Sequence, residues 1–112
     1  MSRLIVIIAH VVAMAALIGS TSEGFADAID GDWCNADGKR MSIRGPEIVT
    51  PGGKTTRGDY TRHSFAYIIP AGESGAGDAV QIILRGEYLA QARKGAEGSP
   101  WLEWRRCPAT TS

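Results

Sequence analysis

The sequence has 112 residues and no net charge, because 12 lysines and arginines balance 12 aspartates and glutamates. These charges form no long run of one sign, so the chain lacks the basic footprint that a nucleic-acid-binding protein needs. We expect the one basic pair near the end, Arg105-Arg106, to be the solvated end of a strand.

The first 28 residues have the layout of a secretory signal peptide. One arginine precedes an apolar run over residues 4–18, and small and polar residues follow it. The run is shorter than the roughly 20 residues of a spanning helix, so we expect no stable membrane span and disfavour a retained anchor. Cleavage is expected after Ala28, or as a second choice after Ala26. Residues 29–112 then form a single domain that is periplasmic or secreted.

The predicted domain contains two cysteines, Cys34 near its start and Cys107 near its end. An exported chain meets an oxidising compartment, where such a pair forms a disulfide bond. Closing so long a loop stabilises a fold by about 4–5 kcal/mol on the chain-entropy model. Free thiols or half of a metal site are the alternative, but zinc-ligand spacing is missing from the sequence, so we expect no metal and no cofactor.

Short alternating runs separated by turn residues begin the domain. The pattern predicts strands over residues 32–35, 39–44 and 47–50. Ala36-Asp37-Gly38 predicts a tight turn after the first of them, and the order Pro51-Gly52 predicts a type II turn after the third.

The segment 62–69 has the strongest strand signal, because aromatic and β-branched residues alternate along it up to Pro70. The alternation predicts a central strand with His63, Phe65 and Tyr67 on its core face. The glycine-rich stretch 70–78 that follows is expected to be an exposed loop, and we take it as a possible contact site for a partner.

Three further strands are predicted over residues 79–85, 87–94 and 101–107. The composition of 87–94 favours a helix, but the segment lacks a good N-cap and its apolar residues alternate, so we favour a strand. The fold class is therefore all-β: a small antiparallel barrel or sandwich of about six to seven short strands. The disulfide would tie the first strand to the last.

His63 is the candidate for acid–base chemistry, with Tyr60 and Arg62 beside it. Ser64 is adjacent to the histidine, but neighbours in a strand point to opposite faces. A half-buried histidine with an ordinary hydrogen bond is the simpler interpretation. We therefore predict no catalytic residue and keep Tyr60, Arg62 and His63 as binding candidates.

The three tryptophans, Trp33, Trp101 and Trp104, all lie close to a cysteine in the sequence. A disulfide would bring the indoles into one neighbourhood, where they would either close one end of the core or line a binding surface. For the second case Trp101 and Trp104 join the binding candidates.

Gly31-Asp32-Trp33 is similar to the G-x-W signature that opens lipocalins and related calycin-like barrels. The resemblance implies that the tryptophan packs across the closed end of a barrel against an arginine of the last strand, here Arg105 or Arg106. More widely, the chain resembles a group of small exported bacterial proteins of unknown function. The shared motifs are Trp33-Cys34, T-P-G-G at 50–53, G-x-Y-x-R-H at 58–63 and Arg106-Cys107.

The function we expect is that of a non-enzymatic binding module, with an exported or envelope protein as its partner, in the manner of small hydrolase inhibitors. A small enzyme that uses His63 as acid or base is one alternative. A structural envelope protein without a discrete ligand is the other.

Overall fold

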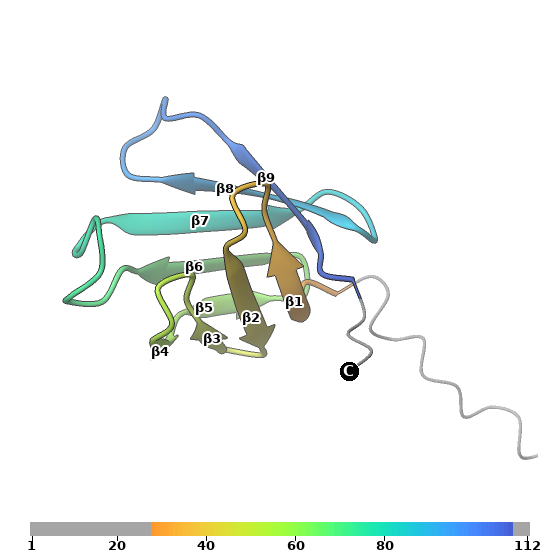
Figure 1. Cartoon of the computed structure of the whole chain (residues 1–112), viewed down its shortest axis with the longest axis horizontal. Coiled ribbons are helices and arrows are strands. Elements are labelled where there is room, and N and C mark those ends of the chain that lie inside the picture. The colour runs from red at the N-terminus through yellow and green to blue at the C-terminus, as the bar shows by residue number, and fades with distance from the viewer. Residues whose placement is uncertain (1–27, 109–112) are drawn as a thin grey trace, which may run out of the picture.

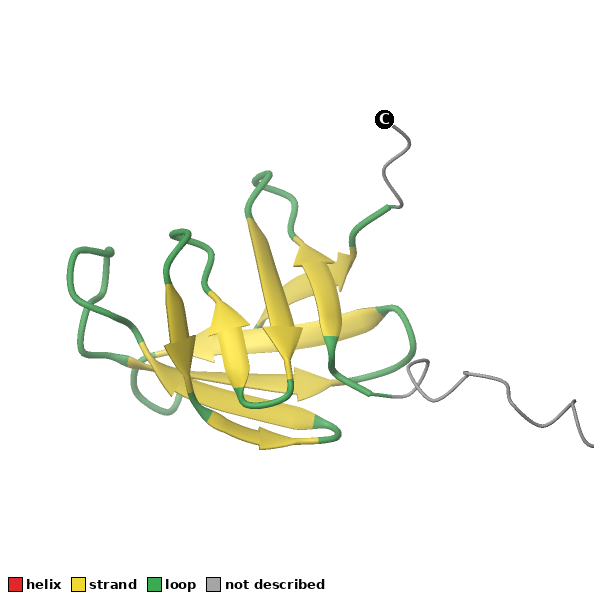
Figure 2. Ribbon diagram, turned by 90° about the horizontal axis from the view of Figure 1, so that it is seen from below, coloured by secondary structure: helices red, strands yellow, loops and turns green. Residues whose placement is uncertain are grey.

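The computed structural model describes residues 28–108, which form one antiparallel sheet of nine strands that curls into a nearly closed barrel (Figures 1 and 2). The strands are β1 (Gly31–Cys34), β2 (Arg40–Arg44), β3 (Glu47–Val49), β4 (Thr55–Arg57), β5 (Asp59–Thr61), β6 (Ser64–Ile68), β7 (Ala79–Leu84), β8 (Leu89–Lys94) and β9 (Leu102–Arg106). Their order across the sheet is β4-β3-β2-β1-β9-β8-β7-β6-β5. The predicted leader lies outside the described residues, apart from Ala28.

The all-β class and the link between the terminal strands are confirmed. Cys34 at the end of β1 bonds to Cys107 just after β9, with an S–S distance of 2.03 Å. The number of strands was underestimated, because β4 and β5 were not predicted. Each of these has three mostly polar residues, too few to produce a recognisable alternation.

The two missed strands close the barrel. β4 lies at one edge of the sheet and β5 at the other, and only Gly58 separates them in the chain. A Cβ atom at Gly58 would overlap the carbonyl oxygen of Ala66, and its N–H donates to the carbonyl of Pro46 at 2.9 Å. The segment therefore crosses from one edge to the other at a position where only glycine fits.

The interior of the barrel is filled with side chains from all parts of the sheet. Alternate residues of β2, β6, β7 and β8 are buried, among them Phe65 and Tyr67, which the alternation placed on the core face. A small barrel of this kind has room inside for little more than its own side chains. The largest fully buried ones are Trp33, Phe65, Ile29, Met41, Ile43, Ile48 and Ile82.

The prediction of one continuous strand over 62–69 was wrong. Arg62 and His63 form the turn of a hairpin in which Tyr60 pairs with Phe65 and Thr61 with Ser64. His63 is consequently exposed at the tip and does not face the core. Alternation cannot detect this turn, because a two-residue loop returns the chain with its apolar residues on the same face.

Two further local predictions can be compared with the structure. The segment Leu89–Lys94 is a strand, as alternation favoured, although its composition suits a helix. The turn at Pro51-Gly52 is not of type II. The N–H of Gly53 donates to the carbonyl of Thr50 at 2.8 Å, but a type II turn needs a positive φ at Gly52, and the positive φ, +96°, is that of Gly53.

A search of the described residues for a helix long and apolar enough to cross a membrane finds none.

Candidate functional site

The five binding candidates occupy four separate places. Trp104 is 6 % exposed and belongs to the core, and Tyr60 is half-buried at one end of the barrel. Arg62 and His63 lie exposed on the β5–β6 turn, and the structure gives the His63 imidazole no polar partner among the described residues. Trp101, just before β9, is half-buried on the outer wall of the barrel. The candidates thus do not form one site.

Tyr60 lies at the end of the barrel where β1 begins, and its hydroxyl donates to the carboxylate of Asp30. This hydrogen bond, followed by burial and the charge of Asp30, raises the pKa of Tyr60. The other carboxylate oxygen of Asp30 accepts the N–H of Gly45 at 2.8 Å. Tyr60 therefore holds the start of the chain against β5 and is occupied by the fold.

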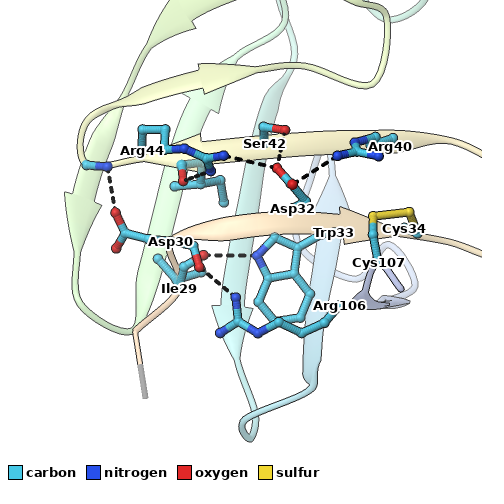
Figure 3. A network of polar contacts seen from close by, with 12 residues as sticks. Ile29, Asp30, Asp32, Trp33, Cys34, Arg40, Ser42, Arg44, Arg106 and Cys107 are labelled. Atoms are coloured by element: carbon cyan, nitrogen blue, oxygen red, sulfur yellow. Dashed lines mark hydrogen bonds and ion pairs between the residues drawn. A yellow bond between two sulfur atoms is a disulfide. The ribbon is translucent and has the colours of Figure 1, made fainter. Parts of the chain in front are cut away.

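Arg106 and Trp33 complete this end of the barrel (Figure 3). The guanidinium carbon of Arg106 lies 4.3 Å from the centre of the Trp33 indole. The same group donates to the carbonyl of Asp30 at 2.6 Å, to that of Ala28 at 2.7 Å and to that of Glu87 at 2.8 Å. Burial lowers the pKa of Arg106, against the raising effect of nearby acidic groups. Of the two arginines that the G-x-W resemblance offered, Arg106 is the one that lies over the tryptophan.

The opposite end is closed by the loop 70–78, which packs on the β3–β4 hairpin. The hydroxyl of Thr50, a residue only 1 % exposed, donates to the carboxylate of Glu73 at 2.6 Å. Lys54 Nζ donates to the carbonyl of Ala71 at 2.7 Å. Burial, together with the charge of Glu73, raises the pKa of Tyr67 to about 12. The loop is therefore anchored at its centre, while its exposed residues still face solvent.

The outer wall over β7, β8 and β9 carries an indole with two arginines. Arg93 lies with its guanidinium carbon 4.4 Å from the ring centre of Trp101, and that of Arg85 is 5.9 Å away. Gln81 accepts a hydrogen bond from Arg93 at 2.7 Å, and Gln91 accepts one from Arg85 at 2.9 Å. We call these five residues the Trp101 surface.

Neither arginine of the Trp101 surface forms an ion pair with a carboxylate in the described part of the chain. Arg93 Nε is also buried without a hydrogen-bond partner. Sequence reasoning found Trp101 but missed Arg85 and Arg93. Their positions could have been found from the alternation in the predicted strands 79–85 and 87–94, which places Gln81, Arg85 and Arg93 opposite the buried residues.

The outer wall over β1 and β2 has a different charge arrangement (Figure 3). The carboxylate of Asp32 lies 2.9 Å from Arg40 and 3.3 Å from Arg44, and it accepts the hydroxyl of Ser42 at 2.7 Å. The hydrogen bond from Ser42 lowers the pKa of Asp32, opposed by burial and supported by the charges of Arg44 and Arg40. Here the arginines share a carboxylate of their own protein.

Residues 28–108 contain no group of three or more histidine, cysteine, aspartate or glutamate side chains that could hold a metal ion. Comparisons with protein-family models, with characterised proteins and with solved structures find no match to this chain.

Proposed function

We propose that this protein is an exported, non-enzymatic binding module that recognises a partner protein through the Trp101 surface. The observation that carries the proposal is the pairing of a half-buried indole with Arg85 and Arg93, neither of which has a carboxylate partner among the described residues. Tryptophan and arginine are the residue types most enriched at the energetic centres of protein interfaces.

The shape of the molecule supports a macromolecular partner. Small ligands bind in concave sites, whereas the outer wall of a barrel is convex and its interior is filled by core side chains. A convex patch matches the surface of another protein. The disulfide and the closed ends keep this wall rigid, which reduces the entropy lost on binding.

Export is part of the proposal, and the disulfide bond is compatible with an oxidising compartment. Of the two predicted cleavage positions, we favour the one after Ala26. Cleavage there keeps Ala28, which is 4 % exposed and whose carbonyl accepts the hydrogen bond from Arg106. Cleavage after Ala28 would remove this acceptor and place a charged amine on the fully buried Ile29.

Chemical cross-linking in an envelope extract of the producing organism tests the proposal. We compare the wild-type protein with the variants Trp101→Ala and Tyr88→Ala. Tyr88 is the control, because it is an aromatic residue 66 % exposed on the β7–β8 turn. We expect a cross-linked partner that Trp101→Ala loses and Tyr88→Ala keeps, and the purified partner should bind with the same dependence. A partner retained fully by Trp101→Ala would refute the assigned surface.

A further inference from the structure

The Trp101 surface has a charge pattern that specifies the chemistry of its partner. We propose that it binds an acidic stretch of polypeptide, whose carboxylates pair with Arg85 and Arg93. This inference rests on the proposed function and adds the chemical class of the partner.

The two outer walls differ in the groups that hold their arginines. On β1 and β2, Asp32 lies between two arginines and reduces their charge. On the Trp101 surface, the oxygens that orient the arginines belong to Gln81 and Gln91. An amide oxygen fixes the direction of a guanidinium without cancelling its charge. The arginines are therefore held in place and remain available to an anion.

Both arginines of the Trp101 surface have more N–H donors than their described partners accept from. A guanidinium has five N–H groups. Among the described residues, Arg93 donates a side-chain hydrogen bond through Nη2 and Arg85 donates one through Nε. Neither terminal nitrogen of Arg85 has a hydrogen-bond acceptor among residues 28–108, so both can form the two-pronged hydrogen bond that a carboxylate accepts. Both guanidinium groups also lie within cation–π distance of the Trp101 ring centre, at 4.4 Å for Arg93 and 5.9 Å for Arg85.

The side chains around the Trp101 surface also bear on the chemistry of its partner. Glu103 lies opposite Gln91 in the register of β8 and β9, and its carboxylate pairs with Arg105 at 3.4 Å and not with Arg85 or Arg93 among the described residues. The patch is basic but small, and the chain as a whole has no net charge. A nucleic acid would require a longer basic track along the wall. A few carboxylates on an extended peptide match the patch in both size and charge.

The experiment uses the oxidised protein and three probes of defined composition. The first is an alternating glutamate–serine dodecapeptide, the second the matching glutamine–serine peptide, and the third an oligothymidylate of twelve nucleotides. Binding is measured by NMR titration, following the Trp101 indole N–H and the arginine side chains. We expect shifts at the Trp101 surface with the glutamate peptide only, and weaker binding as salt rises.

Substitutions then assign the contact. The double variant Arg85→Gln, Arg93→Gln should weaken binding of the glutamate peptide about tenfold or more, because each arginine supplies charge-assisted hydrogen bonds. Arg57→Gln removes an exposed charge on β4 and should leave binding unchanged. Circular dichroism checks that the double variant folds, and the wild-type shift map gives an independent result if it does not.

The outcomes separate this inference from the proposed function. No binding of the glutamate peptide, equal binding of the glutamine peptide, shifts elsewhere on the barrel, or preference for the oligonucleotide would each overturn the acidic-peptide inference. A cross-linked partner that depends on Trp101 would still support the proposed function in those cases. Conversely, peptide binding at Arg85 and Arg93 without any such partner would support the affinity of the Trp101 surface for carboxylates and count against the proposed function.

Discussion

At the scale of single residues, Arg106 connects distant parts of the chain through three hydrogen bonds. Its three carbonyl acceptors belong to Ala28, Asp30 and Glu87, which lie in two segments far apart in the sequence. A half-buried carbonyl that loses its hydrogen-bond donor lowers the stability of the fold by roughly the free energy needed to remove that carbonyl from water. Arg106 therefore joins the first described residues to the β7–β8 turn and to Trp33.

Replacing Arg106 with alanine should lower the free energy of unfolding by about 2–4 kcal/mol, since it leaves several acceptors unpaired and uncovers the Trp33 indole. Arg105→Ala is the matched control. Arg105 is exposed and has one surface ion pair, so its loss should stay within about 0.5 kcal/mol. Urea unfolding of both oxidised variants provides the measurement. Equal effects of the two substitutions would contradict the role assigned to Arg106.

The raised pKa of Tyr67 makes the stability of the fold depend on pH in the alkaline range. Its pKa is raised from 10.0 to about 12 by burial and by the charge of Glu73. The unfolded chain therefore loses this proton first, and the stability that the neutral phenol contributes is present below pH 10 and lost as the pH rises through about 12. The loss amounts to about 2–3 kcal/mol at most.

Urea unfolding between pH 9 and pH 12 checks this dependence. The variant Tyr67→Phe should show a flatter decline of stability over the range than the wild-type protein. Tyr88→Phe, at an exposed position, should follow the wild-type curve. If Tyr67→Phe kept the full decline, another group would have to account for it.

At the scale of elements, the closure of the barrel depends on the bend between β4 and β5. Gly58 is the bend residue, and the carbonyl of Ala66 and the ring of Phe65 occupy the space that a side chain would need. Its φ is not in the left-handed region, so the requirement for glycine is one of space.

Gly58→Ala should therefore destabilise the protein by about 2 kcal/mol or more, because the clash involves backbone and cannot relax by a rotamer change. Gly86→Ala is the control: Gly86 also lacks a positive φ, and its added Cβ would meet no atom within 4 Å. The midpoint of thermal unfolding by circular dichroism compares the two. A tolerated Gly58→Ala would show that the bend can open without cost.

Several elements were predictable because their signals are local. Alternation in the sequence identified β2, β7 and β8, and glycine and proline marked most of the turns. The hairpin at Arg62-His63 was missed because a two-residue turn preserves the alternation on both sides. The docking of Glu73 on Thr50 was missed because the two residues lie 23 positions apart, on loops that carry no common pattern.

At the scale of the whole molecule, the disulfide and the leader can be checked together. We predict that the exported protein begins at Asp27, a residue outside the described part of the chain, and contains the Cys34–Cys107 bond. Intact-mass spectrometry, with and without reductant before alkylation, gives both answers. A mature chain that begins at Ile29 would refute the favoured cleavage position, and alkylation without reductant would refute the bond.

The candidate site was only partly predictable. Trp101 was selected because it is a tryptophan near a cysteine, and the same criterion selected Trp104, which is buried. The two differ in exposure because they lie three residues apart, on opposite faces of the wall. The arginines beside Trp101 come from other strands, and only the register of β7 and β8 places them with the glutamines that orient them.

The sequence by itself determined the all-β class, the cysteine pair and the inward position of Phe65 and Tyr67, because alternation and turn residues act over a few neighbouring positions. The tertiary structure alone decided that the sheet closes at Gly58, that Arg106 covers Trp33, and that Arg85 and Arg93 remain without carboxylate partners among the described residues. These features depend on which distant strands lie side by side and in what register. That arrangement results from packing the whole core at once, so no single segment encodes it.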